Sequence, residues 1–215
     1  MSQLITTELL GEHPLLSSIS TAENLSTAWI RSGDGLIGFG VYKELEITGP
    51  ERFTLARNWW DKEVANFTIK NNVHGGGTGP ILFTSFAFDE SAPSKLIIPQ
   101  IVIGQKNGKS WITWIGDTAQ PEISQLKNSV VSGEIKWADG SISEDKWRNQ
   151  VAVAIKSINA GELEKVVLAR DLTATSTTAI DARQLLKRLE IEYPSTWLFL
   201  VDGLVGATPE LLVRL

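Results

Sequence analysis

The sequence predicts an α+β protein built on mainly antiparallel β-strands with a few helices. Two turn-forming pairs, Asn107-Gly108 and Asp202-Gly203, each separate apolar runs rich in β-forming residues, which is a strong short-range signal of a hairpin. Three other segments carry apolar residues at the three- and four-residue spacing of a helix. The composition, with 42% hydrophobic and 21% charged residues, is typical of an ordinary globular chain.

The first part of the chain is expected to form a hairpin followed by one helix. Residues 29–31 and 36–43 are apolar runs on either side of the turn-forming residues 32–35. Gly49-Pro50 then precedes a segment with helical spacing, so we expect Pro50 in the first turn of a helix that covers a sheet. The apolar positions of this helix are Phe53, Ala56, Trp59, Trp60, Val64 and Phe67.

Residues 36–115 are predicted to be mostly antiparallel sheet, with that helix as the exception. After a glycine-rich turn at residues 75–77, apolar runs follow at residues 81–88, 96–103 and 111–115. Asn107-Gly108 lies between the last two runs and predicts a tight hairpin there.

A second helix is predicted between residues 141 and 161. Ser141 and Glu144 have the spacing of a capping box, and Gly161 provides a C-terminal stop. The apolar face of this helix consists of Trp147, Val151, Ala154, Ile155 and Ile158. Residues 165–170 follow, and their β-branched content predicts a strand. Because side chains alternate along a strand, Lys165, Val167 and Ala169 would share one face.

The C-terminal part is expected to contain a short helix and a hairpin. Asp181 and Gln184 mark the start of the helix, and Pro194 marks where it has ended. Residues 196–201 and 204–205 flank Asp202-Gly203 and form the hairpin, with Glu210 just past it. We interpret residues 173–178 as a polar loop and residues 211–215 as a strand-like run.

Charge and composition exclude several classes of function. The net charge is −5, from 20 basic and 25 acidic residues, and the longest basic run is the Lys187-Arg188 pair, so a nucleic-acid surface is not expected. The absence of cysteine excludes disulfides and thiolate chemistry. No apolar run approaches the roughly 18 residues of a membrane span, and the N-terminus lacks the pattern of a signal peptide. We therefore expect a cytoplasmic protein that does not bind membranes.

Most other candidate sites have simpler explanations. His13 and His74, the only histidines, lie in unrelated loops, so a histidine metal site is not expected. Glycines 75–77 do not precede the Gly-Lys-Ser/Thr start of a phosphate-binding helix. Trp59, Trp60 and Trp147 fall at helical core positions and are better explained as packing residues.

Lys165 and Glu210 form the strongest candidate pair for chemistry. They lie 45 positions apart (210 − 165) on two β-rich stretches. If Val167 and Ala169 point inward, Lys165 points inward too, and burial favours the neutral form of an amine. A neutral amine and a protonated carboxyl facing one cavity can serve as base and acid for a single proton-transfer reaction.

The motifs that contain these two residues resemble those of the chorismate-utilising enzymes, and most closely those of the isochorismate synthases. The motifs are Leu163-Glu-Lys-Val-Val-Leu-Ala-Arg170, after the helix with Trp147, and Gly206-Ala-Thr-Pro-Glu-Leu-Leu212. Earlier stretches at residues 29–31, 35–40, 86–88 and 96–99 fit the same family less specifically. The resemblance spans most of the chain.

The resemblance implies a role for each residue of the pair. Lys165 aligns with the general base that activates water for attack at C2 of chorismate, and Glu210 aligns with the general acid that assists departure of the C4 hydroxyl. Relatives that use ammonia, such as anthranilate synthase, typically carry glutamine at the position of Lys165, so lysine favours water. The product would be isochorismate, for menaquinone or a catechol siderophore. Salicylate synthase, which also keeps both residues, remains an alternative.

The resemblance also implies a partial chain. The family fold is one α+β domain of layered, mainly antiparallel sheets with flanking helices and about twice this length, so residues 1–215 correspond to its N-terminal portion. The family requires Mg2+, and its metal ligands and chorismate-binding residues are expected beyond Leu215, as is a complementary C-terminal chain if the two parts are separate. A truncated product without catalysis of its own is the second hypothesis.

Overall fold

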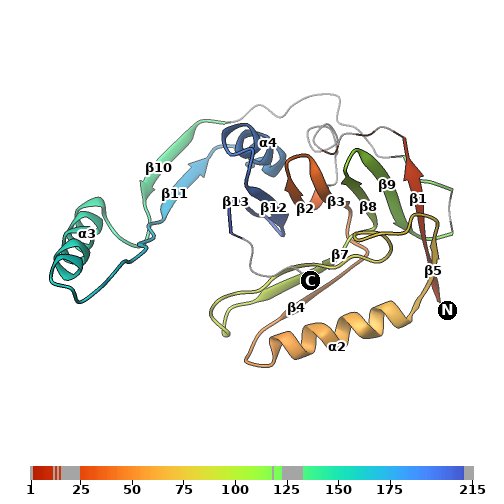
Figure 1. The fold of residues 1–215 in the computed structure, drawn as a ribbon, viewed down its shortest axis with the longest axis horizontal. Helices are drawn as coiled ribbons and strands as arrows, with labels where there is room; N and C mark the ends of the chain where they lie inside the picture. Colours follow the sequence, from red (N-terminus) through yellow and green to blue (C-terminus); the bar gives the residue numbers. More distant parts are fainter. Residues whose placement is uncertain are drawn as a thin grey trace. The chain divides into compact units, whose positions relative to one another are not determined.

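The computed structural model describes residues 2–11, 13, 15, 25–117, 119–122 and 133–210. The chain forms two compact units (Figure 1). Unit 1 comprises Met1–Ser129 and Ala182–Leu215, and unit 2 comprises Val130–Asp181. Each unit is a separate body and is described by itself. Residues 211–215, predicted to be strand-like, lie outside the described residues.

Within the described ranges, unit 1 is built on an eight-stranded sheet, here called the main sheet, with the order β13-β12-β2-β3-β8-β9-β1-β5. Its strands are β1 (Gln3–Leu10), β2 (Leu25–Arg31), β3 (Asp34–Phe39), β5 (Phe67–Asn71), β8 (Ile101–Lys106), β9 (Lys109–Ile115), β12 (Trp197–Val201) and β13 (Leu204–Thr208). All neighbouring strands pair antiparallel except β1 and β5, which are parallel. The α+β class with mainly antiparallel sheets is therefore confirmed.

A second sheet and one helix complete the other side of unit 1. The small sheet has the order β4-β7-β6, from β4 (Lys43–Ile47), β6 (Phe83–Ser85) and β7 (Ser94–Ile98). Helix α2 (Arg52–Ala65) lies beside β4 (Figure 1). Trp59 and Trp60 of this helix pack with the cluster of buried side chains that includes Ile5 and Ile98, so the predicted helix and its covering role are confirmed. The prediction of Pro50 in the first turn is wrong, because the helix begins at Arg52 with Glu51 as its N-cap residue and Pro50 lies just before it.

The predicted hairpins are present because their turns contain residues that tolerate positive φ. Ser32 and Gly33 connect β2 to β3 with φ values of 53° and 82°. Asn107-Gly108, with φ values of 52° and 75°, and Asp202-Gly203, with 50° and 79°, are also positive at both positions, as a two-residue hairpin turn requires. These turns set the register of β8 against β9 and of β12 against β13.

Two of the apolar runs are divided between the two sheets. The run at 96–103 breaks at Pro99-Gln100, so that β7 joins the small sheet and β8 joins the main sheet. Pro99 has no N–H to donate to the hydrogen bonds of a sheet. Its ring packs against Gly38, where an added Cβ would lie only 2.5 Å from Pro99 Cγ. Likewise, residue 43 begins β4 instead of extending the hairpin.

The first and fifth strands were not predicted from the sequence. Phe67 begins β5, although its spacing had placed it on the preceding helix. β1 pairs with β9 on one side and with β5 on the other. Both strands depend on partners that are distant in sequence, which local periodicity does not report.

Helix α4 (Ala182–Glu192) covers one face of the main sheet near β12 and β13, as predicted for the segment after Asp181. Leu186 of this helix is buried with Ile30 of β2 and with Leu198 and Leu200 of β12. Side chains alternate along strands, so Trp29 and Phe199 lie on the opposite face. No helix in the described ranges combines the length and apolar character that a membrane crossing requires.

Unit 2 is small and only loosely packed. Among its described residues, β10 (Ile135–Asp139) pairs antiparallel with β11 (Leu172–Ser176), and α3 (Glu144–Asn159) lies between them in sequence. Our interpretation of residues 173–178 as a loop is wrong for β11, because the polar residues there pair with β10. The α3 prediction is confirmed, including the stop at Gly161, which has a φ of 74°.

The cap of α3 differs from the prediction by two residues. Ser143, not Ser141, is the N-cap residue, and its hydroxyl accepts a hydrogen bond from the Lys146 amide. Ser141 instead donates to Asp171 from both its amide and its hydroxyl, the latter at 2.6 Å. Ser141 therefore ties the segment before α3 to the segment before β11.

A partly buried ion pair joins α2 to the small sheet. Lys43 Nζ lies 2.6 Å from Glu63 Oε2, and Glu63 is only 6% exposed. The hydrogen bond to Glu63 raises the pKa of Lys43 above its ordinary value. We expect Lys43→Met to leave a buried carboxylate unpaired and to lower the free energy of unfolding by about 1–2 kcal/mol, since Lys43 is itself partly exposed.

Urea unfolding followed by tryptophan fluorescence measures this loss. Arg57→Met is the matched control, because Arg57 and Asp61 form an exposed pair at 3.8 Å whose loss should cost less than about 0.5 kcal/mol. Adding Glu63→Met to Lys43→Met is expected to restore part of the stability. Equal losses for the two single variants would contradict this account.

Unit 2 is expected to respond to acid through Asp171. The hydrogen bonds from the side chain and then the amide of Ser141 hold the pKa of Asp171 below its ordinary value. A carboxyl whose pKa falls on folding stabilises the folded state above its unfolded pKa, and this contribution is lost as pH falls through the lowered value. The amide of residue 141 is therefore expected to lose protection against exchange, relative to an unprotected amide at the same pH, as pH drops below about 4. This loss of protection should be absent in Asp171→Asn and reduced in Ser141→Ala. An unchanged acid response in Asp171→Asn would refute the assignment.

Candidate active site

Lys165 lies in unit 2, on a segment that forms neither a helix nor a strand. Residues 165–170 follow α3 and precede β11, and no described strand pairs with them. The prediction of a strand here is therefore wrong for this chain. β-Branched residues favour extended backbone, but a strand also needs a neighbour to complete its hydrogen bonds. Lys165 is exposed, as are Val167 and Ala169, so the inward orientation that we expected is not observed.

Glu210 lies in unit 1, directly after β13. Gly206, Ala207 and Thr208 belong to that strand and pair with β12, so the first part of the motif is held in the main sheet. Beyond the strand, the Glu210 amide donates a hydrogen bond to Thr208 Oγ1 at 3.1 Å. This bond spans Pro209, which has no N–H of its own, and it closes a local turn at the strand end. Glu210 is exposed.

The two residues belong to different units. Lys165 is part of Val130–Asp181, whereas Glu210 is part of the unit that contains the main sheet. Because each unit is a separate body, the convergence of the amine and the carboxyl on one cavity stays a prediction.

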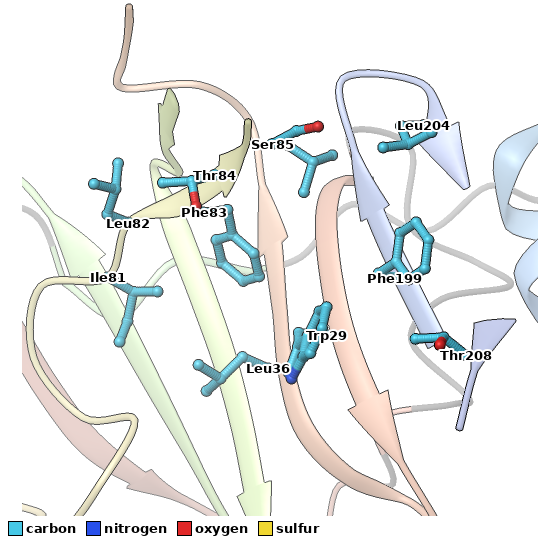
Figure 2. Close-up of a pocket in the computed structure, with 11 residues that line it drawn as sticks. Trp29, Leu36, Ile81, Leu82, Phe83, Thr84, Ser85, Phe199, Leu204 and Thr208 are labelled. Carbon is cyan, nitrogen blue, oxygen red and sulfur yellow. The ribbon is translucent and has the colours of Figure 1, made fainter. Parts of the chain in front are cut away.

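A hollow of about 490 Å³ lies on the face of the main sheet beside β13 (Figure 2). Four strands of the main sheet and the segment at residues 81–85 surround it. Its lining consists of Trp29, Leu36, Ile81, Leu82, Phe83, Thr84, Ser85, Phe199, Val201, Leu204 and Thr208. Thr208 places the Gly-Ala-Thr-Pro-Glu motif at the edge of this hollow, two residues before Glu210.

Aromatic side chains form a row along this face. The rings of Trp29 and Trp197 are stacked with centroids 5.4 Å apart, and Phe199 lies 6.2 Å from Trp29. The guanidinium of Arg31 lies over the Trp197 ring at 5.4 Å. Stacked rings on adjacent strands restrict one another, so this wall of the hollow is rigid.

Gly206 provides the space that the Phe199 ring occupies. The two residues are paired across β12 and β13, and a Cβ on Gly206 would come within 2.4 Å of the ring. The sequence contained a signal for this contact, because counting back from Asp202-Gly203 places residues 199 and 206 opposite each other. We did not draw that inference from the sequence, and we did not anticipate the residues 81–85 that face the ring.

The hollow is suited to packing and not to proton transfer. Its polar side-chain groups are the Trp29 indole N–H and the hydroxyls of Thr84, Ser85 and Thr208, and none of the described side chains that line it is ionisable. An adjoining hollow of about 370 Å³ shares Trp29 and Leu36 and carries charged groups, which are Arg31, Asp34 and Lys106. Asp34 accepts hydrogen bonds from the Asn107 amide at 3.0 Å.

The described residues do not fit a metal site. No group of three or more histidine, aspartate or glutamate side chains among them could hold a metal ion. His13 and His74 lie outside helices and strands in the described ranges. The expected Mg2+ ligands beyond Leu215 stay a prediction.

Comparison with known proteins places the chain in a defined group. The family model for chorismate binding enzymes matches residues 10–215. A Mycobacterium tuberculosis protein (strain CDC 1551 / Oshkosh) named "Putative isochorismate synthase MenF" is 33% identical over 182 residues, which are 78% of this chain and 44% of that protein. The isochorismate synthase EntC of Escherichia coli (strain K12) is 29% identical over 144 residues, covering 65% of this chain and 34% of the relative.

A solved structure shows the same fold. The menaquinone-specific isochorismate synthase MenF from Escherichia coli superposes with a TM-score of 0.61 at 16% identity, and the match covers 96% of this chain and 50% of that one. The chain thus spans about half the length of the relatives that it matches, or less.

The contact between Gly206 and Phe199 predicts a coupled effect on stability. We expect Gly206→Ala to lower the free energy of unfolding by about 1–3 kcal/mol, because the new Cβ overlaps the ring. The same change in a Phe199→Leu background should cost much less, since the smaller side chain leaves room. Thermal unfolding of the four proteins of this double-mutant cycle measures the coupling. Additive losses would show that the ring does not require the glycine.

Proposed function

Because the chain belongs to the chorismate-binding enzyme family, we propose that it forms part of an isochorismate synthase that converts chorismate to isochorismate. The observation that carries this proposal is that the matched region, residues 10–215, contains both the Lys165 and the Glu210 motifs. Relatives named isochorismate synthases, at 33% and 29% identity, support the same activity. Residues 1–215 are then the N-terminal portion of one catalytic domain.

The proposed reaction exchanges one water for another. Lys165, as a neutral amine, takes a proton from a water molecule whose oxygen forms a bond to C2 of the ring. Both conjugated ring double bonds shift, the C4–oxygen bond breaks, and Glu210 donates a proton so that this oxygen departs as water. The atoms balance, because one water enters and one leaves. The substrate is consumed and the product formed without any change in oxidation state.

The two hollows described above do not provide this chemistry by themselves. Chorismate carries two carboxylates, and no cation is among the described residues that line the apolar hollow beside β13. We therefore infer that this hollow is filled by side-chain packing beside the Gly-Ala-Thr-Pro-Glu motif. Just beyond it, the Glu210 amide is bonded to Thr208 Oγ1. The family's Mg2+ requirement would be met by residues outside those described, and no step is derived through it.

Replacement of Lys165 tests the proposal. In the complete enzyme that contains this sequence, Lys165→Ala is expected to reduce kcat for chorismate by about 10²- to 10⁴-fold, because the water is no longer deprotonated. Lys156→Ala, on the exposed last turn of α3, is the matched control and should leave kcat unchanged. Chromatography of the products measures the rate and identifies isochorismate or salicylate. Unchanged kcat in Lys165→Ala would overturn the assignment, and we expect residues 1–215 alone to give no turnover even with Mg2+ present.

A further inference from the structure

A third hollow, of about 320 Å³, lies beside the two-residue turn between β8 and β9 and is here called the hairpin hollow. The end of β1, the loop after β5 and the hairpin itself surround it, all within unit 1. Leu9, Val73 and Trp111 form its apolar wall. Its volume is that of a site for a small molecule, and neither the Lys165 motif nor the Glu210 motif contributes to it.

Two lysines face each other at the rim of the hairpin hollow. Lys106 pairs directly with Lys109 across β8 and β9, so both side chains project from the same face of the main sheet. Like charges in directly opposite positions destabilise an antiparallel pair. In the described ranges, neither ammonium group forms an ion pair with a carboxylate. An anion bound between the two lysines would relieve their repulsion.

No acidic side chain is among the described residues that line the hairpin hollow. The adjoining hollow shares Lys106 and includes Asp34. Asp34 accepts hydrogen bonds from the Asn107 amide at 3.0 and 3.1 Å, so this carboxylate fixes the backbone of the turn. The charges of the described lining are therefore those of the two lysines, together with the imidazole of His74 when it is protonated.

The loop after β5, which forms another part of the lining, is anchored to the main sheet. Trp111 Nε1 donates a hydrogen bond to Gly77 O at 2.9 Å, and the Gly79 amide donates to Thr7 Oγ1 at 3.2 Å. Gly77 has a φ of 87°, and a Cβ there would lie 3.2 Å from the Trp111 ring, so the loop packs closely on the indole. The hollow is therefore shaped before any ligand binds, which lowers the cost of binding.

The same loop carries backbone donors that the protein leaves unused. In the described ranges, the amides of residues 74–76 donate no hydrogen bond to another protein group. A Cβ added to Gly75 or Gly76, which both line the hollow, would have no atom within 4 Å, so this backbone is open to a ligand. Consecutive N–H groups in a glycine-rich turn form a concave site for anions. Such a site needs no helix start of the Gly-Lys-Ser/Thr type, which does not follow these glycines.

We propose that the hairpin hollow binds a small organic phosphate, with the phosphoryl group between Lys106 and Lys109 and the carbon skeleton against the apolar wall. Lysine ammonium groups are compact charges that suit a tetrahedral anion, as loop amides do. A planar carboxylate is matched best by arginine, which is not among the described residues of this lining. Leu9 is 65% exposed, so a carbon skeleton that covers it also buries apolar surface. The ligand differs from chorismate, whose charges are carboxylates, and the inference does not depend on the proposed function.

Solvated lysines alone explain this arrangement less well. Lysine on a strand often serves to prevent one sheet from pairing with another, but that role belongs to edge strands. β8 and β9 are interior strands of the main sheet. Solvation also accounts for neither the anchored loop nor the exposed Leu9 beside the charges, whereas a binding site accounts for both.

Calorimetric titration with phenyl phosphate at low ionic strength tests the proposal, in the full-length protein that contains residues 1–215. We expect one saturable site with a dissociation constant below about 1 mM. Lys106→Gln and Lys109→Gln should each weaken binding by about tenfold or more, whereas Lys106→Arg, which keeps the charge, should retain most of it. Inorganic phosphate should bind at least about fivefold more weakly than phenyl phosphate, because it lacks the ring that covers Leu9.

Matched controls separate this site from unspecific attraction of an anion. Lys187→Gln removes a lysine from α4, which packs on the face of the main sheet opposite to the hairpin hollow, and should leave binding unchanged. Isophthalate, a planar dianion of similar size, should bind at least about tenfold more weakly than phenyl phosphate. Because Lys106 and Lys109 are exposed, their replacement should not lower the melting temperature of the ligand-free protein. Absence of saturable binding would overturn the proposal, as would equal affinity for isophthalate or equal effects of the Lys187 and Lys106 substitutions.

Discussion

The register of the main sheet is the constraint on which unit 1 depends. Asp202-Gly203, with positive φ at both residues, joins β12 to β13 so that residues 201 and 204 face each other. This pairing places Leu200 in the core and Phe199 over Gly206. A slip of one residue would exchange the two faces, bringing the aromatic row inward and exposing the aliphatic core. The hollow, the core and the position of Thr208 all follow from this turn.

The same backbone requirement explains why residues 165–170 behave differently. β1 pairs with β9 and β5, whereas no described strand pairs with residues 165–170. Propensity selects an extended backbone, and hydrogen bonding to a partner converts it into a strand. The difference between the two segments therefore lies in what surrounds them.

The proposed acid and base are supported to different degrees by the folded chain. Glu210 follows a strand of the main sheet, and its amide is bonded to Thr208, so its backbone is held in place. Lys165 belongs to a segment that is exposed on the side where the amine lies.

Local sequence determined the elements whose signals are short-range. Asn107-Gly108 and Asp202-Gly203 specified hairpins because few residues accept positive φ, and the helices α2, α3 and α4 followed from apolar periodicity. The motifs around Lys165 and Glu210 indicated the family, since they depend on residue identity alone. The candidate pair was named from these motifs before any geometry was known.

Tertiary structure alone decided the features that rest on distant partners. Periodicity gave no indication of β1, β5 and β10, of the division of residues 96–103 between two sheets, or of the hollow between Phe83 and Phe199. The sequence also did not show that residues 165–170 lack a described pairing strand, because their β-branched content is the same whether or not a neighbouring strand is present. Strand pairing is a contact between segments far apart in the chain, so neither segment alone determines the free energy of pairing.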